Sequence, residues 1–332
     1  MASPKKNPGS KKPRQKTQGR PSTKKGKKPT SKKSAKGSAR GSGRSAPARG
    51  RSSQSSKRGT RPTSSARGAR SPSKGNYERG SSKRRDDLDG TQIEGRHAVR
   101  ELLLAGNRRV REVAVLADPD HERESDEIEE LCNELHVGLR PMNRRQFDEL
   151  RRTDAPQGVI ARAEPIASVD VADLAGSDGP TPPFLLAIDG VTDPGNLGAL
   201  IRSAECAGVN GLVLARHRAV HISPTVAKAA AGAVEHVPMS LVAGLPSALG
   251  ELKEQGVWVV GLDAGGPTSL HDLSLGSEPI CLVLGAEGRG LGRLVSERCD
   301  SIVSIPMRGQ LGSLNVSVAG ALACFEVVRQ RT

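Results

Sequence analysis

Residues 184–198 read Phe184-Leu-Leu-Ala-Ile-Asp-Gly-Val-Thr-Asp-Pro-Gly-Asn-Leu-Gly198, an apolar run that passes into a loop of glycine, aspartate and proline. The apolar residues do not alternate with polar ones, which indicates a strand buried on both faces of a sheet. Similar runs recur at residues 211–215, 257–262, 280–284 and 301–306, with helical periodicity at 197–207, 225–233 and 246–254. This pattern predicts an α/β domain over residues 184–332, built on a mostly parallel sheet covered by helices.

Three of these strands are followed by loops that contain glycine. The loops are residues 189–198, Leu284-Gly-Ala-Glu-Gly-Arg-Gly-Leu-Gly292 and Ile305-Pro-Met-Arg-Gly-Gln-Leu-Gly-Ser-Leu-Asn315. Neither the P-loop nor the dinucleotide fingerprint fits, because Asn196 replaces the P-loop lysine and the glycines of the second loop alternate every second residue. Ligands of such sheets bind at the carboxyl ends of the strands. We therefore expect a ligand pocket of another type, formed by these loops.

A smaller α/β unit is predicted over residues 91–164. Its expected elements are helices at 94–106 and 144–151, strands at 110–116 and 158–163, and a helix with Ile128, Leu131, Cys132 and Leu135 on one face. Residues 165–183 contain six Pro and Gly residues and few large apolar ones. We interpret them as a linker between the two units.

The net charge of +15 is concentrated at the N-terminus. Residues 1–90 hold 28 Lys and Arg against 4 acidic residues, so the remaining residues carry −9. The same segment has no Val, Ile, Phe or Trp, so it cannot bury enough apolar surface to offset its chain entropy. We expect residues 1–90 to form a disordered basic tail that contacts nucleic acid.

The cellular setting is predicted from what the sequence does not contain. It has no apolar run suited to a signal peptide or a membrane span. The five cysteines are widely spaced and form no C-x-x-C pair, which argues against a zinc site or a disulfide framework. We expect a cytoplasmic protein with reduced cysteines, no metal and no membrane association.

Three blocks resemble, in order, the motifs of the SpoU (TrmH) family of RNA 2′-O-methyltransferases. They are residues 193–204, 284–291 and 305–319. Residues 93–99 and 157–161 are similar to the ribosomal-protein-like RNA-binding domain of the branch that methylates a guanosine of 23S rRNA, although Pro156 stands where that branch often has His. The resemblance implies a small α/β RNA-binding domain followed by a trefoil-knotted SPOUT methyltransferase domain. It also implies S-adenosyl-L-methionine as cofactor, a homodimer, and RNA, large-subunit rRNA in particular, as substrate.

The resemblance places five side chains at the catalytic centre: Asn196, Arg202, Glu287, Ser313 and Asn315. A ribose hydroxyl is weakly acidic, so the enzyme must help to remove its proton and align its oxygen with the methyl group. Arg202 would act there as base or as oxyanion stabiliser. A guanidinium is a poor base, which favours the stabilising role. The alternative is an ordinary arginine on a helix surface.

The other four residues also have plainer interpretations. Asn196 could be the N-cap of the helix that follows it. Ser313 or Asn315 could cap the last helix, or bind a substrate phosphate at its positive end. Glu287 could be a solvated charge, whereas the resemblance makes it a structural or RNA-positioning residue at the site.

The resemblance assigns cofactor binding to Gly285, Ile305, Met307 and Leu314. A glycine at a strand end suits close approach of the backbone to a ligand. For the other three residues, core packing is the alternative. No metal site is expected.

The last predicted helix is apolar on nearly all sides. Val316, Ala319, Ala323 and Val327 lie on one side, and Val318, Leu322 and Phe325 on another. Burial of both sides would be provided by a dimer interface. In the first unit, five arginines supply local positive charge for RNA or form a solvated helix face: Arg96, Arg100, Arg108, Arg109 and Arg111.

The function predicted from these features is S-adenosylmethionine-dependent 2′-O-methylation of a guanosine in 23S rRNA. Two alternatives stay open: a tRNA ribose 2′-O-methyltransferase, and a catalytically silent RNA-binding factor of ribosome assembly. The two-unit layout favours rRNA, because the tRNA branch usually lacks the preceding domain. The intact motifs favour an enzyme.

Overall fold

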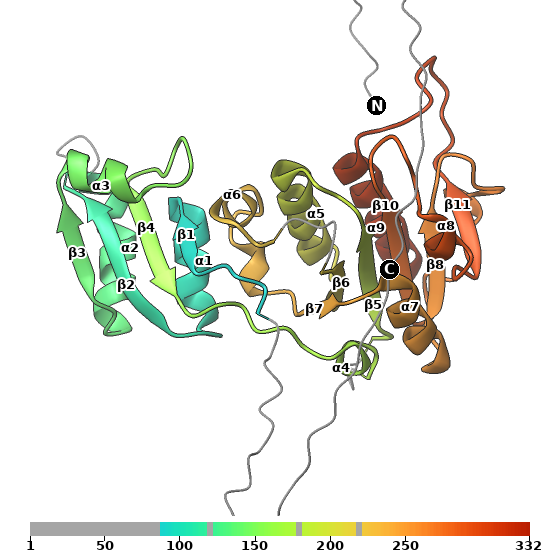
Figure 1. Cartoon of the computed structure of the whole chain (residues 1–332), viewed down its shortest axis with the longest axis horizontal. Helices are drawn as coiled ribbons and strands as arrows, with labels where there is room; N and C mark the ends of the chain where they lie inside the picture. The colour runs from blue at the N-terminus through green and yellow to red at the C-terminus, as the bar shows by residue number, and fades with distance from the viewer. Residues whose placement is uncertain (1–86, 118–121, 177–180, 217–220) are drawn as a thin grey trace, which may run out of the picture. The chain divides into compact units, whose positions relative to one another are not determined.

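The computed structural model describes residues 87–117, 122–176, 181–216 and 221–332 (Figure 1). These residues belong to one compact unit, Tyr77–Thr332. The expected disordered tail lies outside the described residues except for its last four positions. There Asp87 bridges to Ala167, and Leu88 is buried with its N–H donating to the carbonyl of Ile166 at 2.9 Å. No helix in the described part of the chain is long and apolar enough to cross a bilayer.

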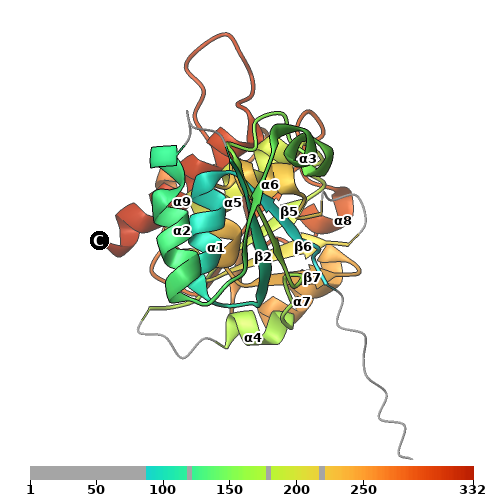
Figure 2. The same cartoon turned by 90° about the vertical axis from the view of Figure 1, so that its left-hand side faces the viewer.

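The first part of this unit is built on a four-stranded sheet of order β1-β4-β2-β3. Its strands are β1 (Gln92–Glu94), β2 (Val110–Leu116), β3 (Leu139–Met142) and β4 (Val159–Ala163). Helices α1 (Arg96–Ala105) and α2 (Glu122–Glu134) pack on the face that carries Val113 and Val115, and α3 (Arg144–Leu150) packs on the other face through Phe147 (Figure 2). Helix α1 lies within the predicted range 94–106 and is capped by Gly106, which has the left-handed conformation that favours glycine.

The second part is built on a seven-stranded sheet of order β7-β6-β5-β10-β8-β11-β9, in which every described pair is parallel. Its main strands are β5 (Phe184–Asp189), β6 (Gly211–Ala215), β8 (Trp258–Leu262), β10 (Ile280–Gly285) and β11 (Ser301–Ser304). The short strands β7 (Met239–Val242) and β9 (Thr268–Ser269) form its edges. The prediction of an α/β fold with a mostly parallel sheet is confirmed.

Helices cover both faces of this sheet, which explains its continuous apolar strands. Leu186 and Ile188 of β5 join a core with α5 (Pro194–Cys206), α6 (Pro224–Ala229) and α9 (Val316–Arg331), and this core continues into the small sheet. Leu185 and Ala187 face a second core with α4 (Val171–Ala175), α7 (Leu245–Glu254) and α8 (Arg293–Ser296). The stretch expected to be a linker therefore contains α4, which is too short to show helical periodicity.

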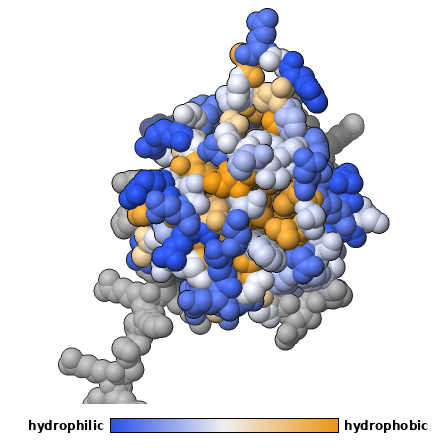
Figure 3. Space-filling model, turned by 90° about the vertical axis from the view of Figure 1, so that its right-hand side faces the viewer, coloured by the Kyte–Doolittle hydropathy of each residue, from blue (hydrophilic) through white to orange (hydrophobic). Residues whose placement is uncertain are grey.

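Helix α9 is buried on one side only. Val316, Ala323 and Val327 are buried, whereas Val318, Leu322 and Phe325 are 48%, 48% and 49% exposed. Figure 3 shows hydrophobic side chains gathered on the face that lies to the right in Figure 1. The second apolar side of α9 thus has no cover within the described part of the chain.

All five cysteines are free thiols. Burial raises the pKa of Cys132 to about 11 and that of Cys324 to about 12, so both stay protonated at neutral pH. Cys206, the last residue of α5, is exposed, yet partial burial and a hydrogen bond with Glu205 raise the pKa of its thiol as well.

Candidate active site

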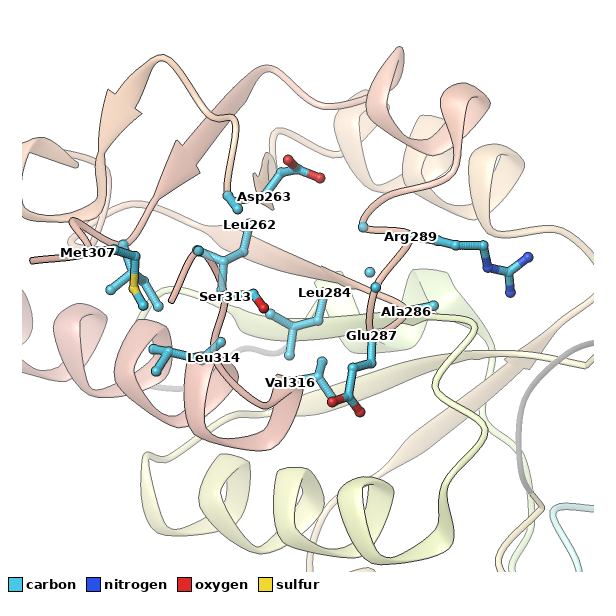
Figure 4. Close-up of a pocket in the computed structure, with 17 residues that line it drawn as sticks. Leu262, Asp263, Leu284, Ala286, Glu287, Arg289, Met307, Ser313, Leu314 and Val316 are labelled. Carbon is cyan, nitrogen blue, oxygen red and sulfur yellow. The ribbon is translucent and has the colours of Figure 1, made fainter. Parts of the chain in front are cut away.

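A cavity of about 330 Å³ lies at the carboxyl ends of β8, β10 and β11 (Figure 4). Its wall is formed by segments around the ends of these strands and the start of α9, and it includes these residues: Leu262, Asp263, Leu284, Gly285, Ala286, Glu287, Gly288, Arg289, Gly290, Ile305, Met307, Gly312, Ser313, Leu314 and Val316. The second and third glycine loops of the sequence therefore share one cavity, at the edge of the sheet where a ligand is expected.

The loop after β10 lies directly against the end of its own strand. A methyl group on Gly285 would lie 2.2 Å from the carbonyl carbon of Gly290, so no side chain fits at this position. Ala286 pairs with Gly290, and both Gly288 and Gly290 have positive φ, of 78° and 65°. Glycines are required here for the turn and for the close backbone approach.

Two aspartates hold this loop from either side. The carboxylate of Asp189, at the end of β5, accepts a hydrogen bond from the N–H of Gly292 at 2.8 Å. Asp263, directly after β8, accepts bonds from the N–H groups of Gly265 (2.9 Å) and Leu291 (3.4 Å). Neither carboxylate was among the residues predicted at the site. Their position at the ends of predicted parallel strands was the available signal.

The four residues expected to bind the cofactor all line the cavity: Gly285, Ile305, Met307 and Leu314. Ile305 is half-buried, and Met307 and Leu314 are 37% and 36% exposed. Ile305 also packs against the main core, so core packing describes part of its surroundings, whereas the exposure of Met307 and Leu314 sets them apart from core residues.

Three of the expected catalytic side chains form a chain of hydrogen bonds between the motifs. Asn315 Oδ1 accepts bonds from the N–H groups of Ser317 (2.8 Å) and Val318 (3.4 Å), so its amide nitrogen points away from α9. That nitrogen donates to Asn196 Oδ1 at 2.8 Å, and Asn196 Nδ2 donates to Glu287 Oε2 at 3.4 Å. Capping of α9 thereby sets the orientation of both amides and links them to the carboxylate at the cavity.

The suggestion that Asn196 caps α5 is wrong. Helix α5 begins at Pro194, and the side chain of Asp193 accepts the bond from the N–H of Asn196 at 2.7 Å. Proline fits the first helical position without loss, so the helix starts earlier than its apolar pattern indicates. Asn196 lies in the first turn, where its side chain can reach the other loops. Asn315, in contrast, is the N-cap of α9.

Of the two remaining predicted catalytic residues, Ser313 lies at the cavity and Arg202 lies outside it. Ser313 lines the cavity beside Leu314, as Figure 4 shows. Arg202 is exposed on α5 and does not line the cavity. It follows Asn196 by six positions, and at about 100° per residue the two side chains leave the helix on different sides.

The described charges on the cavity wall are Asp263, Glu287 and Arg289. The Arg289 side chain extends away from the cavity in Figure 4, and the Asp263 carboxylate lies near the glycine loop. The wall therefore combines backbone groups and apolar side chains with two carboxylates. Such a surface suits a ligand with a flat apolar part, hydroxyl groups and positive charge.

Comparison with known proteins gives one consistent result. The SpoU rRNA Methylase family model matches residues 183–325, and a model described as RNA 2′-O ribose methyltransferase substrate binding matches residues 92–168. The 23S rRNA (guanosine-2′-O-)-methyltransferase RlmB of Escherichia coli is 40% identical over 72% of this chain and 98% of its own length. RlmB of Ralstonia nicotianae is 41% identical over 72% and 95%. The structure of the SpoU methyltransferase AviRb from Streptomyces viridochromogenes with AdoMet aligns with a TM-score of 0.61 and 26% identity, over 72% of this chain and 90% of AviRb.

Proposed function

Since this chain belongs to the SpoU rRNA Methylase family, we propose that it transfers a methyl group from S-adenosylmethionine to the ribose 2′-oxygen of a guanosine in 23S rRNA. It is an RNA 2′-O-methyltransferase with S-adenosylmethionine as its cofactor. The observation that carries the proposal is that two of the three motif loops line one cavity, and hydrogen bonds join the third to them.

The residues of the cavity fit this cofactor. Gly285 lines the cavity with its backbone alone, and Ile305 and Leu314 offer apolar surface for an adenine ring. Asp263 and Glu287 give the wall two negative charges, which suit a sulfonium cation. When bound, S-adenosylmethionine supplies an activated methyl group. We assign its binding to Gly285, Ile305, Met307 and Leu314.

The chain's own residues have to orient the ribose and favour the loss of its 2′-proton. We assign orientation to the linked side chains of Asn315, Asn196 and Glu287, whose hydrogen bonds fix them relative to one another. Ser313 offers a hydroxyl at the cavity wall for a phosphate or ribose contact. Arg202 stabilises the negative charge that develops on the 2′-oxygen, because a guanidinium has donors and no acceptor.

We propose a homodimer, supported by the apolar side of α9 that the described residues leave exposed, Val318, Leu322 and Phe325. Arg202 lies outside the cavity of its own chain, on the helix against which α9 packs. In a dimer formed through α9, Arg202 of one copy can serve the cavity of the other.

Co-expression tests this arrangement. Heterodimers of an Arg202→Ala copy and a Gly285→Ala copy should regain one working site, whereas Arg202→Ala alone should be inactive and Gly285→Ala alone should lose activity at S-adenosylmethionine concentrations near the wild-type Kd. Light scattering of Phe325→Asp should show a monomer. A monomeric wild type with full activity would contradict the dimer.

We further propose the division of the chain that the sequence suggests: a disordered basic tail over 1–90, a ribosomal-protein-like RNA-binding domain over 91–164, a connecting segment over 165–183 and a trefoil-knotted methyltransferase domain over 184–332. The knot is proposed because the chain belongs to the SpoU family, and the return of the chain after β11 to place α9 against α5 and β10 is compatible with it. Because ribosomal RNA is the substrate, we place the enzyme in the cytoplasm.

The substrate is tested by mapping 2′-O-methyl groups in cells that lack the protein. We expect one guanosine of 23S rRNA to lose its methyl group. Loss from a tRNA instead would support the tRNA enzyme. Isothermal titration with S-adenosylmethionine addresses the silent assembly factor, since a protein without detectable binding cannot be the enzyme proposed here.

A further inference from the structure

One arginine of the substrate-binding module, residues 92–168, is buried against the catalytic domain. Arg108 was expected either to supply local positive charge on the first unit or to lie on a solvated helix face. Neither describes it, because its side chain is only 8% exposed. Its Nε and Nη2 donate to the two carboxylate oxygens of Glu235 at 2.8 and 2.5 Å, and the Glu235 side chain is 2% exposed. Its Nη1 donates to the carbonyls of Gly90 and Glu164 at 2.6 and 2.5 Å.

These four hydrogen bonds join three separate segments of chain. Gly90 lies just before the first strand of the module, and Glu164 directly follows its last strand. Glu235 belongs to a short 3-10 helix of the catalytic domain, Ala233–Glu235. The Arg108 guanidinium thus binds both ends of the module and, through Glu235, the catalytic domain.

Neighbouring residues make further contacts between the module and the catalytic domain. Asn107 Nδ2 donates to the carbonyl of Glu235 at 2.8 Å, and His236 Nε2 lies 2.9 Å from a carboxylate oxygen of Glu101 on α1. Gly232 has a φ of +89°, and a methyl group there would lie 2.5 Å from Glu101 Cβ. Residues 222–236, which we call the docking segment, therefore lie directly against α1.

Apolar packing alone would not fix this attachment in one geometry. The module and the docking segment share apolar contacts, with Leu102 of α1 and Val226 and Val234 in one core. Apolar contacts are non-directional, whereas a bidentate Arg–carboxylate pair accepts one arrangement. A buried ion pair adds little stability over apolar side chains because both charges lose their water. The effect of the Arg108–Glu235 pair is to select one orientation of the module relative to the catalytic domain.

We propose that Arg108 and Glu235 are positioning residues, which hold the substrate-binding module in one orientation so that an RNA bound to it presents one ribose to the cavity. This inference rests on the proposed function, because it assigns the module's RNA to the methyl-transfer site. The single chain connection between the module and the catalytic domain would by itself let the module reorient, as domains joined by small interfaces do. Substrate choice would then depend on the fixed spacing between module and cavity.

Glu235→Gln is the test variant, because it removes the charge and keeps the shape. Its kcat/KM on a long 23S rRNA fragment should fall about 10- to 100-fold, the cost of misplacing reacting groups. The affinity for S-adenosylmethionine should not change. Hydrogen exchange should rise in residues 88–106 and in the docking segment and stay at the wild-type level in β10 and α9. Glu235→Asp, which keeps the carboxylate and shortens its reach, should lose less activity than Glu235→Gln.

Glu149→Gln is the matched control. It removes an exposed carboxylate of the module, whose pair with Arg145 is 65% and 90% exposed and contributes little. Wild-type kcat/KM in Glu235→Gln, despite faster exchange in the docking segment, would overturn the positioning role. Unchanged exchange would show that the ion pair does not hold the module. A wild type that methylates no rRNA would overturn the proposed function instead, and the exchange data would still decide whether Arg108 and Glu235 hold the module.

Discussion

Gly285→Ala tests whether the cavity depends on close backbone packing. The added methyl carbon would lie 2.2 Å from the carbonyl carbon of Gly290, 2.4 Å from its oxygen and 2.5 Å from the nitrogen of Leu291. Carbon atoms pack at about 3.5–4.0 Å, so the glycine loop would have to retreat by more than about 1 Å. Asp189 and Asp263 accept hydrogen bonds from the N–H groups of Gly292 and Leu291, so a retreat of this loop strains or breaks these bonds.

The cost can be estimated from overpacking. Extra methyl groups in a well-packed site cost about 1–3 kcal/mol. If the loop moves to relieve the clash, that energy is lost from cofactor binding, and the Kd for S-adenosylmethionine should rise about 5- to 150-fold. If the loop holds, the same energy is lost from folding and the Tm falls.

Isothermal titration measures the change in the Kd for S-adenosylmethionine, and thermal melting measures the change in Tm. Gly244→Ala is the control, because a methyl group there meets nothing within 4 Å, and we expect it to leave both quantities unchanged. A Gly285→Ala protein with wild-type Kd and wild-type Tm would refute the packing argument.

Three further predictions concern single features of the chain. Arg202→Ala should abolish methyl transfer and leave the Kd for S-adenosylmethionine unchanged, and loss of cofactor binding would remove it from the catalytic role. Deleting residues 1–86, which hold all 28 Lys and Arg of residues 1–90, should weaken RNA binding and flatten its dependence on salt while chemistry persists; an unchanged salt slope would mean that the tail does not touch the substrate. A hydrogen bond from Arg329 lowers the pKa of Glu326 to about 2. The ionised Glu326 therefore stabilises the fold fully above the ordinary carboxyl pKa of 4.5, and this stabilisation is lost as the pH falls toward 2. The Tm of Glu326→Gln should therefore fall less than the wild-type Tm when the pH is lowered from about 5 to 3. Equal decreases of Tm in the two proteins would contradict this.

The boundary of the tail shows how local sequence can mislead. Leu88 is the only leucine in residues 1–90, and a composition window assigns it to the disordered segment. The structure buries it, since its backbone pairs with Ile166, about eighty residues further on. Deletions should therefore stop at Asp86.

The same contrast applies to the arginines of the first module. Arg108 and Arg109 are adjacent, and no property of the sequence separates them. Arg108 is buried because Glu235 lies beside it in the fold, whereas Arg109 is exposed. Partners so far apart in sequence are chosen by packing, and single-sequence patterns do not contain that information.

Sequence by itself determined the main elements and the place of the chemistry. Uninterrupted apolar strands require a sheet covered on both faces, and glycines at strand ends require backbone approach, so local residue type fixes both. Tertiary structure alone decided which groups meet: that Asn315, Asn196 and Glu287 form one hydrogen-bonded chain, that Asp189 and Asp263 hold the glycine loop, and that Arg202 stays outside its own cavity. These are contacts between distant segments, set by the order of the strands and the direction in which each helix leaves the sheet.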